Sequence, residues 1–445
     1  MTQPTDQRPA PVPFPAKQAG TERTRWWWTE PAVWTERMLT ALDKGVKGGR
    51  WYSLIDKVYA PQNLAAAWAR VQANAGAAGS DGQSIAAFAA QAERHLQQLH
   101  EQLRTGSYQP LPVRRVWIDK PGSTEQRPLG IPAIRDRVVQ TALRQVLEPI
   151  WEAEFAEQSY GFRPGRGCLD ALQRVEALLR AGYTFVVDAD LKSYFDTIPH
   201  ERLLADVGHK IADQRILDLV AAYLKAGVLD GLQEWTPEQG TPQGAVISPL
   251  LANLYLNEFD HALAQKGYQL VRYADDFVIL CRSPAEAERA LAEVRQLVEA
   301  RGLTLHPSKT RLVDASQAGG FDFLGYHFER AYRWPRAKSL DKLKDKVREL
   351  TPRTHGNALV VIVGRLNASL RGWFHYFKYS HWTTFPRLDK WVRMRMRSIL
   401  RRRAGRRGCG RGRDHHRWPN AYFTDLGLFD LTTAHGALSV PLRTY

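Results

Sequence analysis

The sequence predicts an α+β fold built from two or three packed units. At 445 residues the chain is too long for one ordinary hydrophobic core. Short apolar strands alternate with helices in its middle part, whereas the parts before and after it have mainly helical periodicity. This order of elements indicates a central unit with a small antiparallel sheet, preceded by one helical unit and followed by another.

The first 50 residues are expected to form an N-terminal extension. Its beginning, MTQPTDQRPAPVPFPAKQAG, is rich in proline and polar residues, which predicts disorder, and it has no apolar run typical of a signal peptide. No stretch of the chain approaches the length of a membrane span. The tryptophans of RWWW, residues 25–28, allow two interpretations: packing against a neighbouring core or stacking on a nucleic-acid base.

The later elements follow from periodicity and turn residues. Helical periodicity runs from residue 63 to 103 and is interrupted by the loop AAGSDG, and a strand is expected at 114–118. A helix at 135–150 and a buried strand at 184–187 come next, separated by the glycine- and arginine-rich SYGFRPGRGC and a further helix. A helix at 284–300, a strand with HPSKT and the hairpin GGFDFLGYHF complete this part.

Positive charge is concentrated near the C-terminus. Residues 331–420 contain 24 lysines and arginines against five acids, an excess larger than the net charge of +16 of the whole chain. This clustering is typical of a face that binds a polyanion. Two apolar stripes predict helices in this segment, and RRRAGRRGCGRGRDHHRW, which begins at Arg401, is expected to be a flexible arm or loop.

Three acids lie where buried strands end or turn. Asp190 ends TFVVDAD, and Asp275 and Asp276 interrupt RYADDFVILC. Ionised carboxylates near an apolar sheet repel one another and lose hydration, so they need either a solvated turn or a cation between them. Neighbouring strand positions point to opposite faces, so only one of the adjacent pair would face a shared site unless a turn relaxes this limit. If Asp190 and Asp275 converge, their oxygens suit Mg²⁺ and two-metal phosphoryl transfer.

Seven motifs occur in an order that is typical of a known family: RPLGIP, SYGFRPGRG, DADLKSYFD, GTPQGAVISPLLANLYL, RYADDFVIL, HPSKT and FDFLGY. The series resembles that of group II intron-encoded reverse transcriptases, which double as splicing maturases. GRLNASLRGWFHYF, at residues 364–377, is similar to the family's maturase region, domain X, which forms the thumb. The resemblance covers roughly residues 63–420. It implies a right-hand polymerase with these parts: fingers (51–158), palm (159–330), thumb or domain X (331–404) and a basic tail (405–445).

The resemblance implies an RNA-directed DNA polymerase, a nucleotidyltransferase with two Mg²⁺ ions per active site and Mn²⁺ as an alternative. Its partners would be an intron RNA template, a DNA primer or target, and dNTPs. The implied location is the bacterial cytoplasm, near the nucleoid and not a membrane, and the sequence gives no oligomeric state. Two alternatives stay open: a maturase without polymerase activity, and a domesticated enzyme outside an intron.

The cysteines bear on the type of enzyme within the family. Cys168, Cys281 and Cys409 are too widely spaced for a disulfide framework or a zinc motif, which suits a reducing cytosol. In the basic run near the C-terminus, RRRAGRRGCGRGRDHHRW, the available soft metal ligands are Cys409, His415 and His416. The resemblance is therefore to the compact type that lacks the HNH endonuclease domain.

The resemblance also implies roles for individual residues. The expected catalytic and metal-binding carboxylates are Asp190, Asp275 and Asp276, and the backbone carbonyl of Leu191 would also face a metal. The residues expected to bind the incoming nucleotide are Lys120, Arg127, Phe195, Gln243, Gly244 and Lys309. The expected primer grip consists of Phe323, Leu324 and Gly325. The expected RNA contacts are Arg371, Trp373, Arg393, Arg395, Arg397 and Arg401.

Physical chemistry suits several of these roles. Lys120 and Arg127 offer the cationic donors that a triphosphate needs. Phe195 stands where the family places a steric gate against the ribose 2′-OH, and Gly244 would let the backbone approach closely. Lys309 is an expected general acid for the departing pyrophosphate. Plainer interpretations stay open, with Phe195 as an ordinary core residue and the three cations as solvated surface charges.

Overall fold

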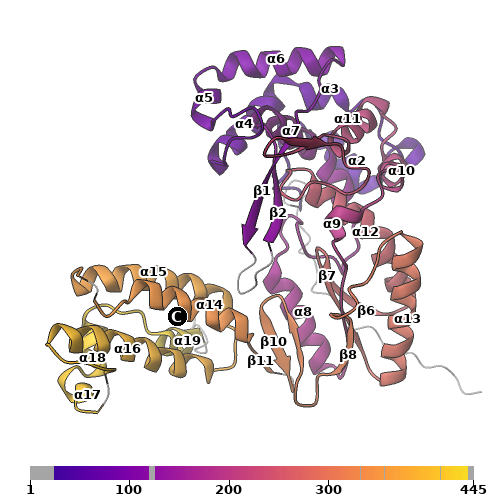
Figure 1. Cartoon of the computed structure of the whole chain (residues 1–445). Helices are drawn as coiled ribbons and strands as arrows, with labels where there is room; N and C mark the ends of the chain where they lie inside the picture. Colours follow the sequence, from indigo (N-terminus) through magenta and orange to yellow (C-terminus); the bar gives the residue numbers. More distant parts are fainter. Residues whose placement is uncertain (1–24, 120–125, 331, 355, 411, 439–445) are drawn as a thin grey trace, which may run out of the picture. The chain divides into compact units, whose positions relative to one another are not determined.

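The computed structural model describes residues 25–119, 126–330, 332–354, 356–410 and 412–438. The chain divides into two compact units, unit 1 (Met1–Leu312) and unit 2 (Val313–Tyr445) (Figure 1). The predicted disordered lead-in and the predicted nucleotide ligand Lys120 lie outside the described residues. In the part of the chain that is described, no helix has both the length and the apolar character needed to cross a membrane.

The helices of unit 1 form an N-terminal group and a central group. The N-terminal group comprises α2 (Glu36–Lys44), η1 (Lys47–Gly49), α3 (Ile55–Tyr59), α4 (Pro61–Asn74), α5 (Ile85–Ala89), α6 (Ala92–Thr105) and α7 (Ile134–Glu152). The central group comprises α8 (Cys168–Arg180), α9 (Tyr194–Thr197), α10 (His200–Lys210), α11 (Gln214–Leu224), α12 (Ser248–Gln265) and α13 (Pro284–Ala300). The predicted helix at 284–300 is α13, with the same bounds, and the predicted helical stretch 63–103 contains α5 and parts of α4 and α6.

Helix α7 is buried along most of its length because α3, α4, α6 and α12 pack around it. Its apolar stripe, with Val138, Val139 and Val146 fully buried, follows helical spacing. The tryptophans of residues 25–28 do not share one environment. Trp26 is buried in the core of unit 1, as the packing interpretation expects, whereas Trp27 is 71% exposed.

The central sheet of unit 1 has the strand order β6-β7-β3-β8. Its strands are β3 (Phe185–Asp190), β6 (Gln269–Tyr273), β7 (Asp276–Cys281) and β8 (Arg311–Asp314). Helix α8 contacts β6 and β7, helix α13 contacts β3 and β7, and Figure 1 shows the strands between these two helices. Because both faces are covered, β7 is a continuous run of buried residues from Phe277 to Cys281 rather than an alternating one.

A second sheet of unit 1 has the order β2-β1-β4-β5. Its strands are β1 (Val113–Asp119), β2 (Gln126–Ile131), β4 (Val228–Asp230) and β5 (Gln233–Trp235). Strand β1 pairs antiparallel with β2 and parallel with β4. The sequence predicted β1 but neither β4 nor β5, because each of these contains only three residues and leaves no periodic signal.

Unit 2 combines a small sheet with helices. The sheet has the order β11-β10-β9, with β9 (Phe321–Phe323), β10 (Tyr326–Glu329) and β11 (Tyr332–Pro335). The helices are α14 (Ala337–Leu350), α15 (Leu359–Phe377), α16 (Thr384–Arg403), α17 (Asp414–Arg417), α18 (Asn420–Asp425) and α19 (Leu431–Leu438). A separate hydrophobic core joins α14, α15 and α16, as the two apolar stripes predicted.

The residues predicted to form a flexible arm or loop, 401–418, contain the end of α16, a loop and the short helix α17. The chain beyond them folds back onto α16, and Phe423 and Leu431 enter the core of unit 2. Asp389 in α16 accepts hydrogen bonds from the backbone nitrogens of Leu431 (3.0 Å) and Thr432 (2.9 Å) at the start of α19. Within the loop after α16, Gly410 is where the backbone approaches α16 so closely that a Cβ would collide with Arg397.

Candidate active site

The two adjacent acids lie at the turn between β6 and β7. Tyr273 ends β6 and Asp276 begins β7, so Ala274 and Asp275 form the turn, and Ala274 has a left-handed backbone with φ +59°. Asp276 is the register partner of Asp190 in the antiparallel pair of β7 and β3. The turn therefore relaxes the alternation of a regular strand and brings Asp275 close enough to Asp190 for their charges to interact.

Neighbouring charges shift the pKa of Asp275 in opposite directions. Burial raises the pKa of the Asp275 carboxyl, and the Asp190 carboxylate raises it further, whereas Arg127 and Lys309 lower it. The Lys309 ammonium lies 2.6 Å from Oδ2 of Asp190. Lys309 is presented by a tight turn in which the carbonyl of His306 accepts from the nitrogens of Lys309 and Thr310, both at 3.3 Å. Of the predicted nucleotide-binding cations, Lys309 thus contacts Asp190, and the charge of Arg127 acts on Asp275.

The donor set fits a divalent cation in its chemistry. Asp190, Asp275 and Asp276 are each partly exposed and offer only hard oxygen ligands, and the ammonium of Lys309 already balances the charge of Asp190 as a cation would. Within the described residues, however, no group of three or more His, Cys, Asp or Glu side chains is arranged closely enough to hold a metal ion. The side chains present thus match a divalent cation in ligand type.

Leu191 is held by the segment that precedes Lys309. It forms an isolated antiparallel bridge with Leu305. The bridge consists of two hydrogen bonds, from His306 N to the Asp190 carbonyl (2.7 Å) and from Lys192 N to the Thr304 carbonyl (2.8 Å). Neither bond uses the carbonyl of Leu191, the atom that was predicted to face a metal.

The TPQG loop, residues 241–244, forms backbone hydrogen bonds with α9 and with strand β2 of the second sheet. Thr241 N donates to the Phe195 carbonyl (2.7 Å), and Gly130 N in β2 donates to the Gln243 carbonyl (2.6 Å). Gly244 has φ +108°, and a Cβ there would lie 2.6 Å from the Gly130 carbonyl oxygen. The loop therefore needs glycine at this position. Phe195 is half-buried, with its ring against the core of unit 1.

The predicted primer grip is the turn of the β9–β10 hairpin in unit 2. Leu324 and Gly325 have φ values of +47° and +83°. The turn is held from both sides, because Tyr376 donates its hydroxyl to the Leu324 carbonyl (2.7 Å) and Ser339 donates its hydroxyl to the Gly325 carbonyl (3.0 Å). Phe323 is 1% exposed, so its side chain belongs to the interior and only the next two residues are accessible at the turn.

The predicted RNA-binding arginines of α16 mostly have partners within unit 2. Arg397 is 2% exposed and donates to the Trp418 carbonyl (2.9 Å) and Asn420 Oδ1 (2.7 Å), so its predicted role in RNA contact conflicts with its position. The other three are half-buried and pair with Asp430, with Thr351 and with Asp414; they are Arg393, Arg395 and Arg401.

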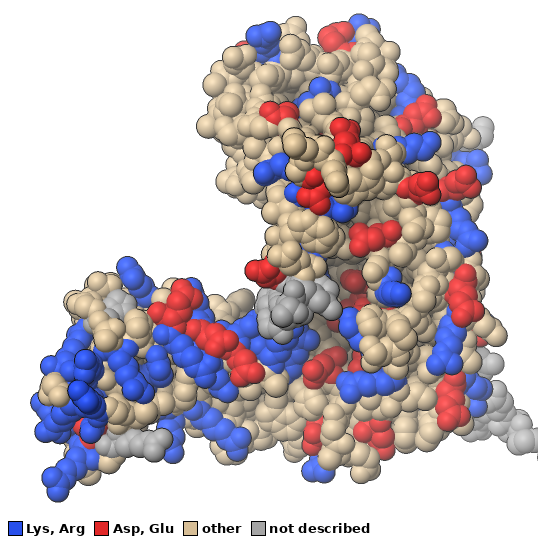
Figure 2. Space-filling view, viewed as in Figure 1, with Lys and Arg blue, Asp and Glu red and all other residues tan. Residues whose placement is uncertain are grey.

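Accessible cations lie elsewhere on unit 2. Figure 2 shows lysines and arginines gathered on one face of it. Arg371 is exposed, with its guanidinium 4.7 Å from the Phe429 ring, and Trp373 is half-buried and stacked on Phe377 at 4.8 Å. Four arginines at and beyond the end of α16 are also exposed: Arg402, Arg403, Arg406 and Arg407.

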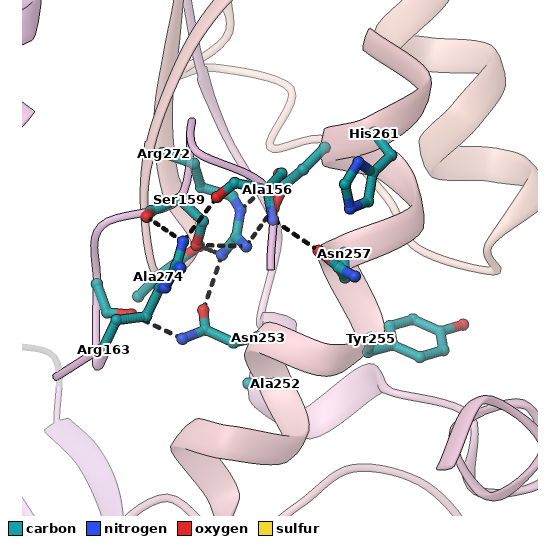
Figure 3. Close-up of polar contacts among 12 residues, drawn as sticks. Ala156, Ser159, Arg163, Ala252, Asn253, Tyr255, Asn257, His261, Arg272 and Ala274 are labelled. Carbon is teal, nitrogen blue, oxygen red and sulfur yellow. Dashed lines mark hydrogen bonds and ion pairs between the residues drawn. The ribbon is translucent and has the colours of Figure 1, made fainter. Parts of the chain in front are cut away.

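Sequence reasoning missed a buried polar cluster under the turn. Arg272, which precedes Tyr273 in β6, is fully buried and contacts side chains of α12 (Figure 3). Burial alone would lower the pKa of its guanidinium, but Asp260 outweighs burial and raises it, so Arg272 stays charged. A signal was present in NLYLNEFD, because Asn253, Asn257 and Asp260 recur at helical spacing in an otherwise apolar helix.

Comparison with known proteins identifies the class. The family model described as reverse transcriptase (RNA-dependent DNA polymerase) matches residues 118–328, and that described as group II intron, maturase-specific domain matches residues 340–418. The chain thus contains an RNA-dependent DNA polymerase domain followed by a maturase domain. It belongs to the group II intron reverse transcriptase and maturase family. The prediction of this family and of a mixed α+β fold is confirmed.

Individual relatives show how far the similarity extends. Protein YkfC of Escherichia coli (strain K12) is 38% identical over 291 residues, which cover 57% of this chain and 76% of YkfC. Group II intron-encoded protein LtrA of Lactococcus lactis subsp. cremoris is 41% identical over 173 residues, which cover 39% of this chain. The match spans only 29% of LtrA.

Two solved complexes also resemble the chain. A partial Cas6-RT-Cas1–Cas2 complex is 27% identical, with a TM-score of 0.36, over 56% of this chain and 41% of that chain. Telomerase from Candida albicans, in complex with the TWJ fragment of telomeric RNA, is 13% identical, with a TM-score of 0.41, over 71% of this chain and 64% of that chain.

Proposed function

We propose that the chain is the reverse transcriptase of a group II intron, which binds the intron RNA, assists its splicing and copies it into DNA during retrohoming. The observation that supports this most is the register of β3 and β7, which sets Asp190 opposite Asp276 at the turn that carries Asp275. A protein that only binds RNA has no evident need for three acids at the end of a buried sheet. Residues 51–158, 159–330 and 331–404 would be its fingers, palm and thumb.

The proposed chemistry is addition of a dNTP to a DNA primer. Asp190, Asp275, Asp276 and the Leu191 carbonyl would hold two Mg²⁺ ions, or Mn²⁺, which lower the pKa of the attacking hydroxyl and stabilise the pyrophosphate leaving group. Arg127, whose positive charge acts on Asp275, would bind the triphosphate as a bidentate donor.

The remaining site residues would select the nucleotide and hold the strands. Phe195 would exclude a ribose 2′-OH, and the neighbouring loop with Gln243 and Gly244 would contact the nucleotide. Lys309 would donate a proton to the departing pyrophosphate. The turn at Leu324 and Gly325, whose two carbonyls are both held by hydrogen bonds, would hold the primer end.

The proposed RNA-binding surface is the exposed basic face of unit 2. Exposed arginines such as Arg371 and Arg402 can neutralise RNA phosphates and release counterions without leaving internal partners unpaired. Trp373, which is half-buried, would stack on an unpaired base. This electrostatic binding would support both splicing assistance and template capture.

The decisive experiment is primer extension on an RNA template with dNTPs and Mg²⁺. The purified chain is compared with the double variant Asp275→Ala, Asp276→Ala and with the control Asp218→Ala, which removes an exposed acid from α11. We expect cDNA from the wild type and the control but none from the double variant, while all three bind RNA equally. Absence of product from a folded, RNA-binding wild type would contradict the polymerase proposal.

The intron-specific part of the proposal needs its own measurement. Affinity for a group II intron RNA is compared with affinity for an unrelated structured RNA of equal length, at several salt concentrations. We expect the chain to bind the intron RNA more tightly than the unrelated RNA and to accelerate splicing of the intron RNA. Equal affinities, with polymerase activity intact, would instead support an enzyme that works outside an intron.

A further inference from the structure

Arg272 uses every donor of its guanidinium inside the protein. The side chain is fully buried, and its five N–H groups meet five acceptors (Figure 3). Two bonds reach the Asp260 carboxylate, from Nε to Oδ1 (2.7 Å) and from Nη2 to Oδ2 (2.5 Å). The others reach Asn253 Oδ1 (3.0 Å), Ser159 Oγ (2.8 Å) and the Ala274 carbonyl (2.9 Å).

The bond to Ala274 links the cluster to the turn. Ala274 is the left-handed residue of the turn, and it immediately precedes Asp275. A left-handed backbone is unfavourable for alanine and persists only where the surroundings enforce it. Arg272 supplies such a constraint, because its Nη1 donates a hydrogen bond to the Ala274 carbonyl (2.9 Å).

The loop from Gln158 to Gly161 constrains the same turn through backbone hydrogen bonds and a close backbone approach. Arg272 N donates to the Gln158 carbonyl (2.9 Å), and Tyr160 N donates to the Arg272 carbonyl (2.8 Å). Gly161 then lies so close that a Cβ there would collide with the backbone nitrogen of Ala274, and its carbonyl accepts from Asn253 Nδ2 (2.7 Å). The loop, α12 and β6 thus contact one another at Arg272, and all three restrict the backbone of the turn.

We infer that Arg272, together with Asp260 and Asn253, is a positioning unit that fixes the backbone of the turn and so aims the Asp275 carboxylate at the divalent cation. This inference rests on the proposed polymerase function and adds residues that touch neither nucleotide nor metal. Lysine cannot replace Arg272, because an ammonium lacks the planar fork that binds Asp260 and Ala274 at the same time. Metal affinity and turnover should therefore depend on Arg272, whereas RNA binding should not.

A purely structural role makes a different prediction. If the cluster served only to stabilise unit 1, any variant that folds would bind metal and turn over normally. The double variant Arg272→Met, Asp260→Leu separates the two roles, because removing both charges leaves neither one unpaired in the interior. It is expected to fold, yet it cannot hold the Ala274 carbonyl.

A matched control is available against the same helix. Arg301 also contacts α12, where it binds Glu258 (2.7 Å) and the Tyr255 carbonyl (2.9 Å). Its other ion-pair partner, Asp206, belongs to α10 and not to the turn. Arg301→Lys therefore removes a mostly buried guanidinium that contacts α12 and leaves the turn in place. We expect this control to keep wild-type metal binding and turnover.

The test uses the whole 445-residue chain and two independent readouts. Direct Mn²⁺ binding is measured by electron paramagnetic resonance of the free ion, without nucleotide, and kcat and KM for dNTP are measured by primer extension. For Arg272→Lys and for the double variant, with folding checked by circular dichroism, we expect weaker Mn²⁺ binding. We also expect kcat to fall about 100-fold, the loss typical of a misplaced catalytic group, with KM nearly unchanged.

The outcomes distinguish this inference from the proposed function. Wild-type Mn²⁺ affinity and kcat in a folded double variant would overturn the positioning role. A wild type that binds Mn²⁺ but makes no cDNA would contradict the polymerase proposal, and the Mn²⁺ titrations of the variants would still decide the role of Arg272. Loss of Mn²⁺ binding in Arg301→Lys as well would also overturn the inference, because the effect would then not be specific to the turn.

Discussion

The ammonium of Lys309 lies 2.6 Å from Oδ2 of Asp190, so a cation neutralises this carboxylate. A divalent ion that bound through Oδ2 of Asp190 would displace the lysine, whose side chain is 58% exposed and can move into solvent. The released ammonium would then be available to protonate the pyrophosphate. One lysine would thus serve in succession as a substitute cation and as an acid.

The first prediction concerns Lys309→Gln. Removing an exposed ion pair worth roughly 0.2–1 kcal/mol should tighten metal binding at most about fivefold. Loss of a general acid should at the same time lower the rate of the chemical step by about 10²–10⁴. Mn²⁺ titration and single-turnover primer extension would measure the two effects separately. Lys192→Gln, a change at an exposed neighbour, is the control, and weaker metal binding in Lys309→Gln would contradict the double role of this lysine.

The second prediction concerns Phe195→Ala. Without the ring, a ribose 2′-OH should no longer collide, so the preference for dNTP over NTP should fall by about 10–200-fold. The measurement is the ratio of kcat/KM for dCTP and CTP on one template. Because Phe195 also packs against the core of unit 1, thermal unfolding must show that the variant is folded. An unchanged ratio in a folded variant would leave Phe195 as an ordinary core residue.

The third prediction concerns the exposed arginines at and beyond the end of α16. Changing Arg402, Arg406 and Arg407 to glutamine should weaken RNA binding and make its dependence on log[salt] shallower by about 0.7–0.9 for each phosphate that is no longer neutralised. Arg397→Gln should instead destabilise unit 2, because its partners are the Trp418 carbonyl and Asn420. An unchanged salt slope in the triple variant would place the RNA surface elsewhere.

The fourth prediction concerns stability against pH. Burial raises the pKa of Asp136 to about 6 from an ordinary 3.8, against the opposing hydrogen bonds from Tyr108 and Leu111 N. The folded state therefore holds this proton more tightly than the unfolded state. The contribution of Asp136 to the free energy of unfolding is fully present below about pH 4. It is lost as pH rises through about 6, and the loss amounts to roughly 3 kcal/mol.

Asp136→Asn provides the measurement. Urea unfolding of both proteins between pH 4 and pH 7.5 gives the difference in free energy of unfolding, in which the titration of other groups cancels. We expect the free energy of unfolding of Asp136→Asn to increase relative to that of the wild type as pH rises. A difference that stays constant with pH would mean that Asp136 is ionised throughout.

Motif order and strand periodicity predicted the parts of the site that are local in sequence. Asp190 ends the buried run of β3 and Asp276 begins that of β7, and both runs were visible in the sequence. The sequence led us to expect Asp190 and Asp275 to converge, whereas the register partner of Asp190 is Asp276. Gly244 is also a local signal, because a glycine beside a predicted nucleotide ligand already suggests a close backbone approach, which the structure places against Gly130. The sequence could not indicate that Lys309 would pair with Asp190, since that contact depends on the packing of two distant segments.

Burial by distant segments explains the errors. The stripe of Leu388, Val392, Met396 and Ile399 was predicted and is buried. Arg397 lies next to that stripe and was assigned to the solvent face, but the chain around Trp418 returns to cover it. Periodicity describes one buried face of a helix and gives no indication of a second one. Arg272 was missed for the same reason, since its partners come from three separate segments.

The return of the last helices onto α16 also sets an order of events during synthesis. The core of unit 2 contains Leu431, so it cannot close until the ribosome has made almost all of this sequence. Unit 1 ends at Leu312 and has its own core, so it can fold while the rest is still being translated. The sheet that carries the acids would therefore begin to form on the ribosome well before the basic unit is complete, and a nascent chain would acquire the proposed RNA-binding face later than this sheet.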